Sequence, residues 1–319
     1  MTAKTVSHVR LGLLAVGLIG ANVFRSLPAS PAAPVQEPGE RPPFVLPDNV
    51  TVHTNLVYSR TENREVVADL YLPKTGAGPF PAVVYIHGSG MPNKGREGSK
   101  DAFRRQAALL AAKGFVGLTI SYRFRTDVRF PGCISDGKAA VRWLRANSRQ
   151  HRVNPDKIAI VGGSWGGYIA SMVATTEHLP EFEGDGSNRG YSSRVAAAVA
   201  FNSLLDPIGT NTARRMNRSP GKFIDWVGAT YEDRPDLWEK ASPLVHAGKH
   251  SPPFLLLSGT NDPTGAFVES KAMMQKLLAA GVPAEFFTAE GARHGFFHDP
   301  PWFELTLKRM EEFLTKYLK

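Results

Sequence analysis

Residues 158–175 read IAIVGGSWGGYIASMVAT, with Ser164 between two pairs of glycines. The apolar run before the glycines predicts a strand, and the apolar residues after them predict a helix. Glycine at positions 162 and 166 gives the pattern Gly162-x-Ser164-x-Gly166, typical of a nucleophile elbow that holds a strained serine with its hydroxyl exposed. The stretch therefore predicts Ser164 as a nucleophile; the alternative is a structural glycine-rich turn.

On both sides of this turn, apolar runs alternate with helical patterns. Runs of about six apolar residues predict strands buried on both faces, and two earlier stretches joined by a polar turn predict an antiparallel pair. Strand alternating with helix implies a mostly parallel sheet. We expect an α/β fold with eight strands and helices on both faces of the sheet. The predicted strands are 51–59, 65–72, 82–87, 115–121, 158–162, 195–201, 254–258 and 284–289, and the predicted helices are 101–113, 134–148, 165–178, 264–280 and 302–318.

A base to activate the serine is expected on the loop after the last strand. A serine hydroxyl is a poor nucleophile unless a neighbouring base accepts its proton. His294 lies in GARHG, between the last predicted strand and the last predicted helix. His298 is the alternative, but it lacks flanking glycines. We therefore predict His294 as the general base.

The acid that would orient this histidine is expected after the seventh strand. There the chain reads FLLLSGTNDP, which places Asp262 four residues beyond Ser258. A carboxylate at this point can accept the Nδ1–H of the histidine and stabilise the imidazolium. Asp206, after the sixth strand, is the alternative acid. The chain order Ser164, Asp262, His294 is that of an α/β-hydrolase triad.

Donors for a tetrahedral oxyanion are expected at two places. One is the backbone N–H of Trp165, the residue after the nucleophile. The other is the loop after the third strand, where His87-Gly-Ser-Gly90 resembles a His-Gly-Gly-Gly loop and offers the amides of Gly88 or Ser89. We interpret His87 as a residue that orients this loop.

The segment from 206 to 251 is too long for a simple connection between strands. We predict a small cap of short helices that helps to shape a substrate pocket; the alternative is a packed connection without ligand contact. Trp165, Tyr168 and Trp226 are candidates either for stacking on an aromatic or sugar group or for core packing.

Three arginines that follow the fourth predicted strand have two different interpretations. Arg123 and Asp136 predict an ion pair that anchors the loop between them, whereas Arg125 and Arg129 are candidates for substrate contact. Cys133 opens a helical pattern and is interpreted as a small buried residue.

The N-terminus resembles an export signal. Basic residues precede the short apolar run 11–21, and small residues follow it. We predict a signal peptide or N-terminal anchor over 1–33, a proline-rich linker over 34–48, and a hydrolase domain over 49–319 with the cap at 206–251. Cleavage gives a secreted or periplasmic protein; retention of the apolar segment gives a membrane-anchored one.

Composition argues against several function classes. The net charge is +9, but the basic residues form no dense run interleaved with aromatics, so nucleic-acid binding has no support. A single cysteine permits no intramolecular disulfide, and no Cys-x-x-Cys or Cys/His cluster predicts a metal. We expect neither metal nor cofactor, and the sequence makes no prediction of oligomeric state.

Several stretches of residues 50–319 together carry a likeness to one known family. They are DLYLPK (69–74), VYIHGSG (84–90), ISYR (120–123), DGKAAVRWLRAN (136–147), NPDKIAIVGGSWGG (154–167) and residues 182–188, 192–195, 241–243, 252–254 and 291–295. On these residues, the chain resembles the BD-FAE-type esterases, the feruloyl and acetyl-xylan esterase-like branch of the α/β-hydrolases. Three positions depart from that pattern: Ser89 replaces a second glycine, Trp165 stands where alanine is frequent, and Phe201-Asn-Ser replaces aromatic-glycine-proline.

Together, the motifs and the resemblance predict a serine carboxylic-ester hydrolase that works through an acyl-enzyme. The expected partner is a small-molecule or polysaccharide ester with a short or aromatic acyl group. One alternative is a prolyl-oligopeptidase-like peptidase. That family normally carries an N-terminal propeller domain, and the residues before position 50 are too few to form one. The other is a non-catalytic binding protein on the same fold, although all three triad residue types are present.

Overall fold

The computed structural model describes residues 43–61, 64–88, 102–124, 128–209 and 222–319. The predicted signal segment and most of the proline-rich linker lie outside these ranges, as do Ser89 and Arg125. Within the described ranges, no helix combines the length and the apolar character that crossing a membrane requires.

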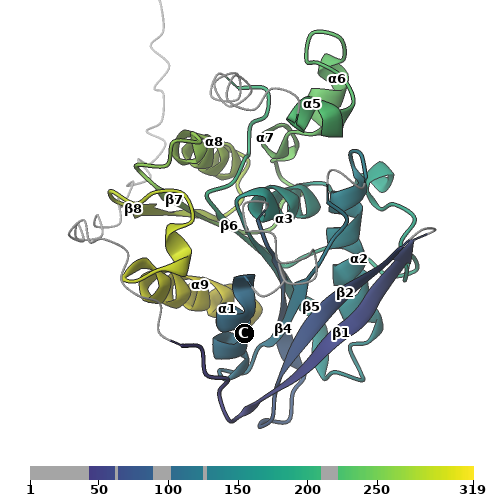
Figure 1. Cartoon of the computed structure of the whole chain (residues 1–319), viewed down its shortest axis with the longest axis vertical. Coiled ribbons are helices and arrows are strands. Elements are labelled where there is room, and N and C mark those ends of the chain that lie inside the picture. Colours follow the sequence, from purple (N-terminus) through teal and green to yellow (C-terminus); the bar gives the residue numbers. More distant parts are fainter. Residues whose placement is uncertain (1–42, 62–63, 89–101, 125–127, 210–221) are drawn as a thin grey trace, which may run out of the picture. The chain divides into compact units, whose positions relative to one another are not determined.

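Among the described residues, eight strands form one sheet in the order β1-β2-β4-β3-β5-β6-β7-β8. β2 runs antiparallel to both of its neighbours, and the other neighbours are parallel. The prediction of a mostly parallel eight-stranded sheet is confirmed (Figure 1). The strands are β1 Val50–Thr61, β2 Arg64–Pro73, β3 Phe80–Ile86, β4 Val116–Ile120, β5 Val153–Gly163, β6 Ala197–Phe201, β7 Phe254–Gly259 and β8 Ala284–Ala289.

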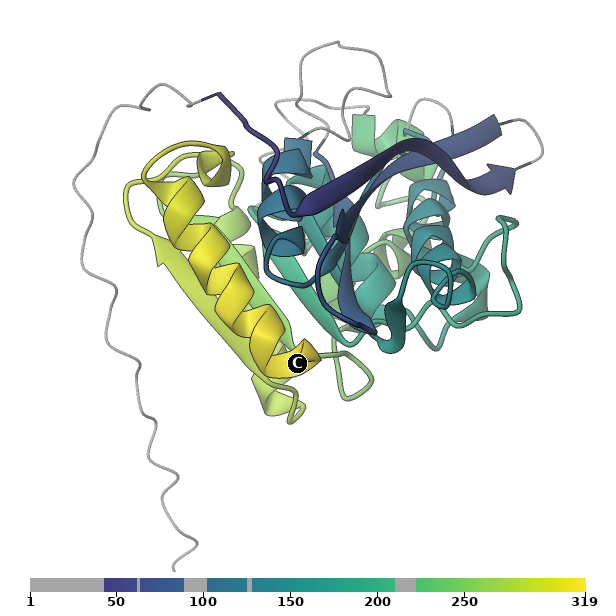
Figure 2. The ribbon, with the colours of Figure 1, turned by 90° about the horizontal axis from the view of Figure 1, so that it is seen from below.

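Two hydrophobic cores lie on opposite faces of this sheet. Side chains alternate along a strand, so in β3 Val84 belongs to one core and Val83 to the other. The core around Val84 is covered by α2 (Gly132–Ala146), α3 (Trp165–Thr175) and α8 (Ala266–Ala279). The core around Val83 is covered by α1 (Arg104–Ala111) and α9 (Trp302–Leu318), which Figures 1 and 2 show on the same side of the sheet.

The five predicted helices are present in the described chain, and the ends of the predicted helices and strands differ from the observed ends by a few residues. The largest difference is at the start of the strand β5, which begins at Val153 instead of residue 158. Residues 154–157 are polar or proline and carry no apolar signal, but Val153 pairs with Phe80 on β3. Pairing with a neighbouring strand thus extends β5 beyond the apolar run.

The segment between β6 and β7 contains three short helices in its described part: α5 (Lys222–Val227), α6 (Pro235–Lys240) and α7 (Pro243–His246). Trp226 and Trp238 anchor the first two, since both side chains are buried. The indole N–H of Trp238 also donates to the carbonyl of Ala229 at 3.0 Å. The described part of the segment therefore consists of short helices and connections that pack through two tryptophans, and its role as a cap stays a prediction.

Candidate active site

Ser164 lies at the sharp turn between β5 and α3. Its backbone has φ 56° and ψ −119°, a conformation that non-glycine residues rarely adopt. Its N–H donates to the carbonyl of Phe201 on β6 at 2.8 Å, and its carbonyl accepts the N–H of Tyr168 at 3.0 Å. These two hydrogen bonds, one to the next strand and one in the first turn of α3, hold the strained residue in place.

The glycines of this turn are required by close backbone contacts. A Cβ on Gly166 would lie 2.1 Å from the carbonyl oxygen of Ile86 on β3, and a Cβ on Gly162 would lie 2.1 Å from the carbonyl oxygen of Gly166. Both neighbours are backbone atoms, which cannot move aside as a flexible side chain would. The close approach of α3 to β3 thus depends on glycine at position 166, and the tight turn from β5 into α3 depends on glycine at position 162.

We expect Gly166→Ala to lower the free energy of unfolding by about 3 kcal/mol or more, because the new methyl group overpacks a rigid backbone contact. Gly190→Ala is the matched control, since a Cβ there meets nothing within 4 Å. Urea unfolding followed by fluorescence measures both. Equal stabilities for the two variants would contradict the tight packing between α3 and β3.

The structure brings Ser164, His294 and Asp262 together from three separate loops. Nε2 of His294 lies 2.9 Å from Oγ of Ser164, and Nδ1 lies 2.8 Å from Oδ2 of Asp262. A carboxylate can only accept, so Nδ1 carries the proton and Nε2 is free to accept the serine O–H. The Asp262 side chain is fully buried, whereas 34% of the His294 side chain is exposed. The serine end of the relay therefore faces the solvent side and the carboxylate end faces the protein.

The Asp262 carboxylate accepts hydrogen bonds at both oxygens. Oδ1 accepts the backbone N–H of Thr264 at 2.9 Å and its hydroxyl at 2.7 Å. Oδ2 accepts His294 and also Nδ2 of Asn202, which comes from the end of β6. Burial raises the pKa of Asp262, but the hydrogen bonds from His294 and Thr264 outweigh burial, and the pKa lies below its ordinary value. The carboxylate is therefore held in its charged form.

Sequence patterns missed both of these supporting residues. The Thr264 contact is local, and Asp-x-Thr is an Asx-turn pattern that could have indicated it. Asn202 lies 60 residues before Asp262, and only the adjacency of β6 and β7 in the sheet brings the two together.

The loop after β3 lies against Ser164. A Cβ built on Gly88 would be 3.1 Å from Cβ of Ser164 and 3.0 Å from the carbonyl oxygen of Gly163. Trp165, at the first position of α3, is the other predicted backbone donor and directly follows the nucleophile. Ser89, the alternative donor on this loop, lies outside the described residues. Gly88 and Trp165 thus flank Ser164, which is where donors to an oxyanion are needed.

His87 holds this loop through its side chain and its backbone. Its Nδ1 lies 2.8 Å from the carbonyl oxygen of Gly88, and its ring stacks on Tyr122 with centroids 4.5 Å apart. The Tyr122 hydroxyl donates to the carbonyl of His87 at 3.0 Å. Burial lowers the pKa of His87 to about 4, only partly offset by the Gly88 bond. A neutral His87 that donates to Gly88 fits the predicted orienting role.

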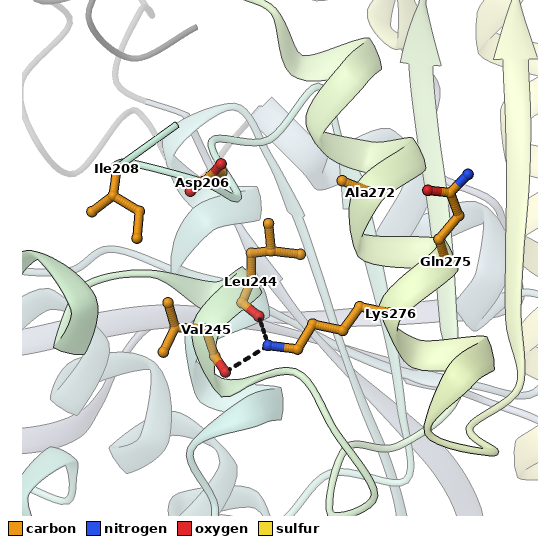
Figure 3. A pocket seen from close by; sticks show the side chains of 7 residues that line it. All are labelled: Asp206, Ile208, Leu244, Val245, Ala272, Gln275 and Lys276. Carbon is orange, nitrogen blue, oxygen red and sulfur yellow. Dashed lines mark hydrogen bonds between the residues drawn. The ribbon is translucent and has the colours of Figure 1, made fainter. Parts of the chain in front are cut away.

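The two alternative triad residues occupy other surroundings. His298 lies beside Phe297 and Phe103, with ring centroids 4.2 and 5.8 Å away. Asp206 lines a groove of about 590 Å³ between α7 and α8 (Figure 3). In this groove Nζ of Lys276 donates to the carbonyls of Leu244 and Val245 at 2.7 and 2.9 Å. None of the three triad side chains lines this groove.

An aromatic cluster connects the turn at Ser164 with α5. Trp165 packs against Tyr168 and against Phe223 and Trp226 of α5, with ring centroids 4.9 to 6.2 Å apart. Tyr168 and Trp226 are completely buried, and 7% of Trp165 is exposed. Core packing is therefore the structural role of Tyr168 and Trp226, and α5 rests on the side chain next to Ser164.

Two further expectations are confirmed. Arg123 and Asp136 form an ion pair, with Nη2 and Oδ1 2.8 Å apart, and the backbone N–H of Arg123 donates to the same carboxylate at 2.7 Å. Cys133 is buried, and burial raises the pKa of its thiol, which disfavours the thiolate. In the part of the chain that the structure describes, no group of three or more His, Cys, Asp or Glu residues is placed to hold a metal ion.

Comparisons with known proteins show that the chain is similar to several esterases. The esterase LipC of Mycobacterium tuberculosis is 27% identical over 226 residues, which cover 68% of this chain and 53% of LipC. The chain spans about half the length, or less, of the curated relatives it matches first. Esterase 2 of Thermogutta terrifontis, solved with bound propionate, is 27% identical with a TM-score of 0.68, over 84% of this chain and 94% of that one.

A truncated carbohydrate esterase from gut microbiota has a TM-score of 0.70 at 23% sequence identity. The match covers 84% of this chain and 96% of that esterase chain, and at this identity it supports the fold alone. The fold is therefore that of the α/β-hydrolases. The BD-FAE family model matches residues 68–277, which include Ser164 and Asp262 and end before His294. Because this match covers more than half of the sequence, the chain belongs to the BD-FAE family.

Proposed function

We propose that this protein is a serine carboxylic-ester hydrolase in which Ser164 is the nucleophile, His294 the general base and Asp262 the residue that orients the histidine. The continuous hydrogen-bond relay from Ser164 Oγ through His294 to Asp262 carries the proposal. The position of the serine at a strained turn between β5 and α3 supports it.

In the first half of the reaction, Oγ of Ser164 attacks the ester carbonyl carbon while Nε2 of His294 takes the hydroxyl proton. The carbonyl oxygen becomes an anion, which the amides of Gly88 and Trp165 are proposed to bind. As the intermediate collapses, the bond to the alcohol oxygen breaks, and His294 returns the proton to that oxygen. The acyl group is left on Ser164.

In the second half, a water molecule attacks the acyl-serine. His294 accepts a proton from the water, and the same donors bind the second oxyanion. The bond to Oγ then breaks, the proton passes to Oγ, and the carboxylic acid leaves. Asp262 stays ionised throughout and stabilises the imidazolium, consistent with its lowered pKa.

We propose a short or aromatic acyl group on a small-molecule or plant-polysaccharide ester. A short group is supported by the bulk of Trp165 beside the nucleophile and by α5 packed on that ring. Export to the periplasm or cell exterior, or anchoring through the N-terminal apolar segment, fits a polymer substrate and remains part of this proposal.

The test is hydrolysis of an ester panel: p-nitrophenyl acetate, butyrate and decanoate, methyl ferulate and acetylated xylan. We expect turnover of acetate or ferulate esters, little turnover of decanoate, and covalent labelling by a fluorophosphonate probe. A chromogenic proline amide should not be cleaved. Absence of both labelling and turnover would overturn the hydrolase proposal, and cleavage of the proline amide in preference to the esters would favour a peptidase.

A further inference from the structure

Asn202 directly follows β6 and has a backbone conformation that suits few residue types. Its φ is +45°, in the left-handed region that asparagine and aspartate tolerate better than other non-glycine residues. The side chain is buried, and the backbone N–H donates to the carbonyl of Leu257 on β7 at 2.9 Å. The side chain is therefore fixed at the carboxyl end of the sheet, between the strands that precede it and Asp262.

The amide of Asn202 and the imidazole of His294 converge on one carboxylate oxygen. Nδ2 of Asn202 lies 2.5 Å from Oδ2 of Asp262, and Nδ1 of His294 lies 2.8 Å from the same atom. The other oxygen, Oδ1, is occupied by the two bonds from Thr264. Rotation of the carboxylate about its last bond would break bonds at both oxygens, so Asn202 and Thr264 together fix the direction in which Asp262 faces the histidine.

The amide oxygen of Asn202 indicates that the side chain does more than fill space. Among the described residues, its Oδ1 is buried without a hydrogen-bond partner. A buried unpaired oxygen lowers stability, and a merely structural asparagine would be expected to pair both ends. The one bond that its side chain makes is to the charged oxygen that holds the histidine.

We propose that Asn202 is a positioning residue of the triad: by donating to Oδ2 of Asp262, it holds the carboxylate aimed at His294. This inference rests on the proposed hydrolase function. It predicts that the donor, and not merely the volume of the side chain, sets the rate of the serine attack.

The charged groups near Asp262 favour a neutral hydrogen-bond donor at position 202. His294 is the titratable group that acts on Asp262, and it approaches from the loop after β8. On α8, the Glu269 carboxylate faces the same loop as Asn202 and accepts the backbone N–H groups of Leu205 and Asp206 at 2.7 and 3.1 Å. A second negative charge at position 202 would thus stand beside Asp262 on a loop that Glu269 already contacts.

The experiment measures kcat and KM for p-nitrophenyl acetate between pH 5.5 and 9 in wild type and Asn202→Asp. When protonated, the substituted carboxyl donates an O–H to Asp262 and replaces the amide; when ionised, it loses the donor and repels the charge. We expect the ratio of variant to wild-type kcat to fall about 10- to 100-fold as pH rises, with little change in KM. A packing role would give a ratio that does not depend on pH.

Asn202→Gly supplies a second measurement, because glycine keeps the left-handed backbone and removes the donor. We expect kcat to fall about 10-fold or more at all pH values where wild type is active. Ser203→Ala is the control on the same turn. Its hydroxyl donates to the carbonyl of Phe201 at 3.3 Å and not to Ser164, Asp262 or His294, so its loss should leave kcat within about twofold. If Asn202→Gly does not fold, the pH dependence of the ratio of Asn202→Asp kcat to wild-type kcat is sufficient to test the role of Asn202.

The outcomes separate the two proposals. A wild-type enzyme that hydrolyses the ester, combined with a flat Asn202→Asp ratio, overturns the role of Asn202 and leaves the hydrolase function intact. A wild type that neither hydrolyses esters nor labels with fluorophosphonate overturns the function, and with it the basis for assigning Asn202.

Discussion

Ser164→Ala is expected to lower kcat for ester hydrolysis by about 10⁴- to 10⁶-fold, the range seen when the nucleophile of a serine triad is removed. The alanine has no Oγ to attack the carbonyl or to pass a proton to Nε2 of His294, which lies 2.9 Å from that oxygen in the native chain. The fold should persist, since both hydrogen bonds that hold the turn come from the backbone of residue 164. Steady-state kinetics with p-nitrophenyl acetate and fluorophosphonate labelling provide the measurements.

A matched control for this variant is Ser171→Ala on the same helix. Ser171 is buried in α3, and its Oγ has no partner among the described residues, so its removal should not affect the relay. We expect normal labelling and turnover in this control. Substantial residual turnover in Ser164→Ala, at more than about one per cent of wild type, would mean that another group attacks the substrate.

Asp262→Asn is expected to lower kcat by about 10⁴-fold without unfolding the chain. An amide N–H directed at Nδ1 favours the tautomer with the proton on Nε2, and that nitrogen can then no longer accept the proton of Ser164. The loss should appear mainly in kcat, because the carboxylate is buried behind the imidazole and does not reach the solvent side of the site.

Asp206→Asn tests whether this effect is specific to one carboxylate. Asp206 also follows a strand of the sheet and is an acid candidate by sequence, but it lines the groove between α7 and α8 (Figure 3). We expect its amide variant to keep wild-type kcat within about twofold. A large loss in Asp206→Asn, with activity retained in Asp262→Asn, would exchange the two assignments.

The sheet was predictable because most of its parallel strands are buried on both faces and therefore read as continuous apolar runs. Val83 and Val84 illustrate the point, since these neighbouring residues are both buried and belong to different cores. Strand ends were less predictable. The start of β5 is polar and gives no apolar signal, and its pairing with Phe80 forms only when β3 and β5 are neighbours in the folded sheet.

The three triad positions were predictable because each follows a strand and because their order along the chain is characteristic. The residues that hold them in place were harder to predict. Asn202 is one polar residue after an apolar strand, and its contact with Asp262 depends on β6 lying next to β7. The orientation of the loop by His87 depends on burial against Tyr122, which sequence spacing does not encode.

The placement of the site on the last four strands of the sheet affects when the protein can act. Ser164, Asn202, Asp262 and His294 follow β5, β6, β7 and β8, which are successive neighbours in the sheet. During synthesis the serine emerges 130 residues ahead of the histidine that it needs. Under the proposed mechanism, a nascent chain therefore carries an inert Ser164 until the segment with His294 has emerged and packed beside it.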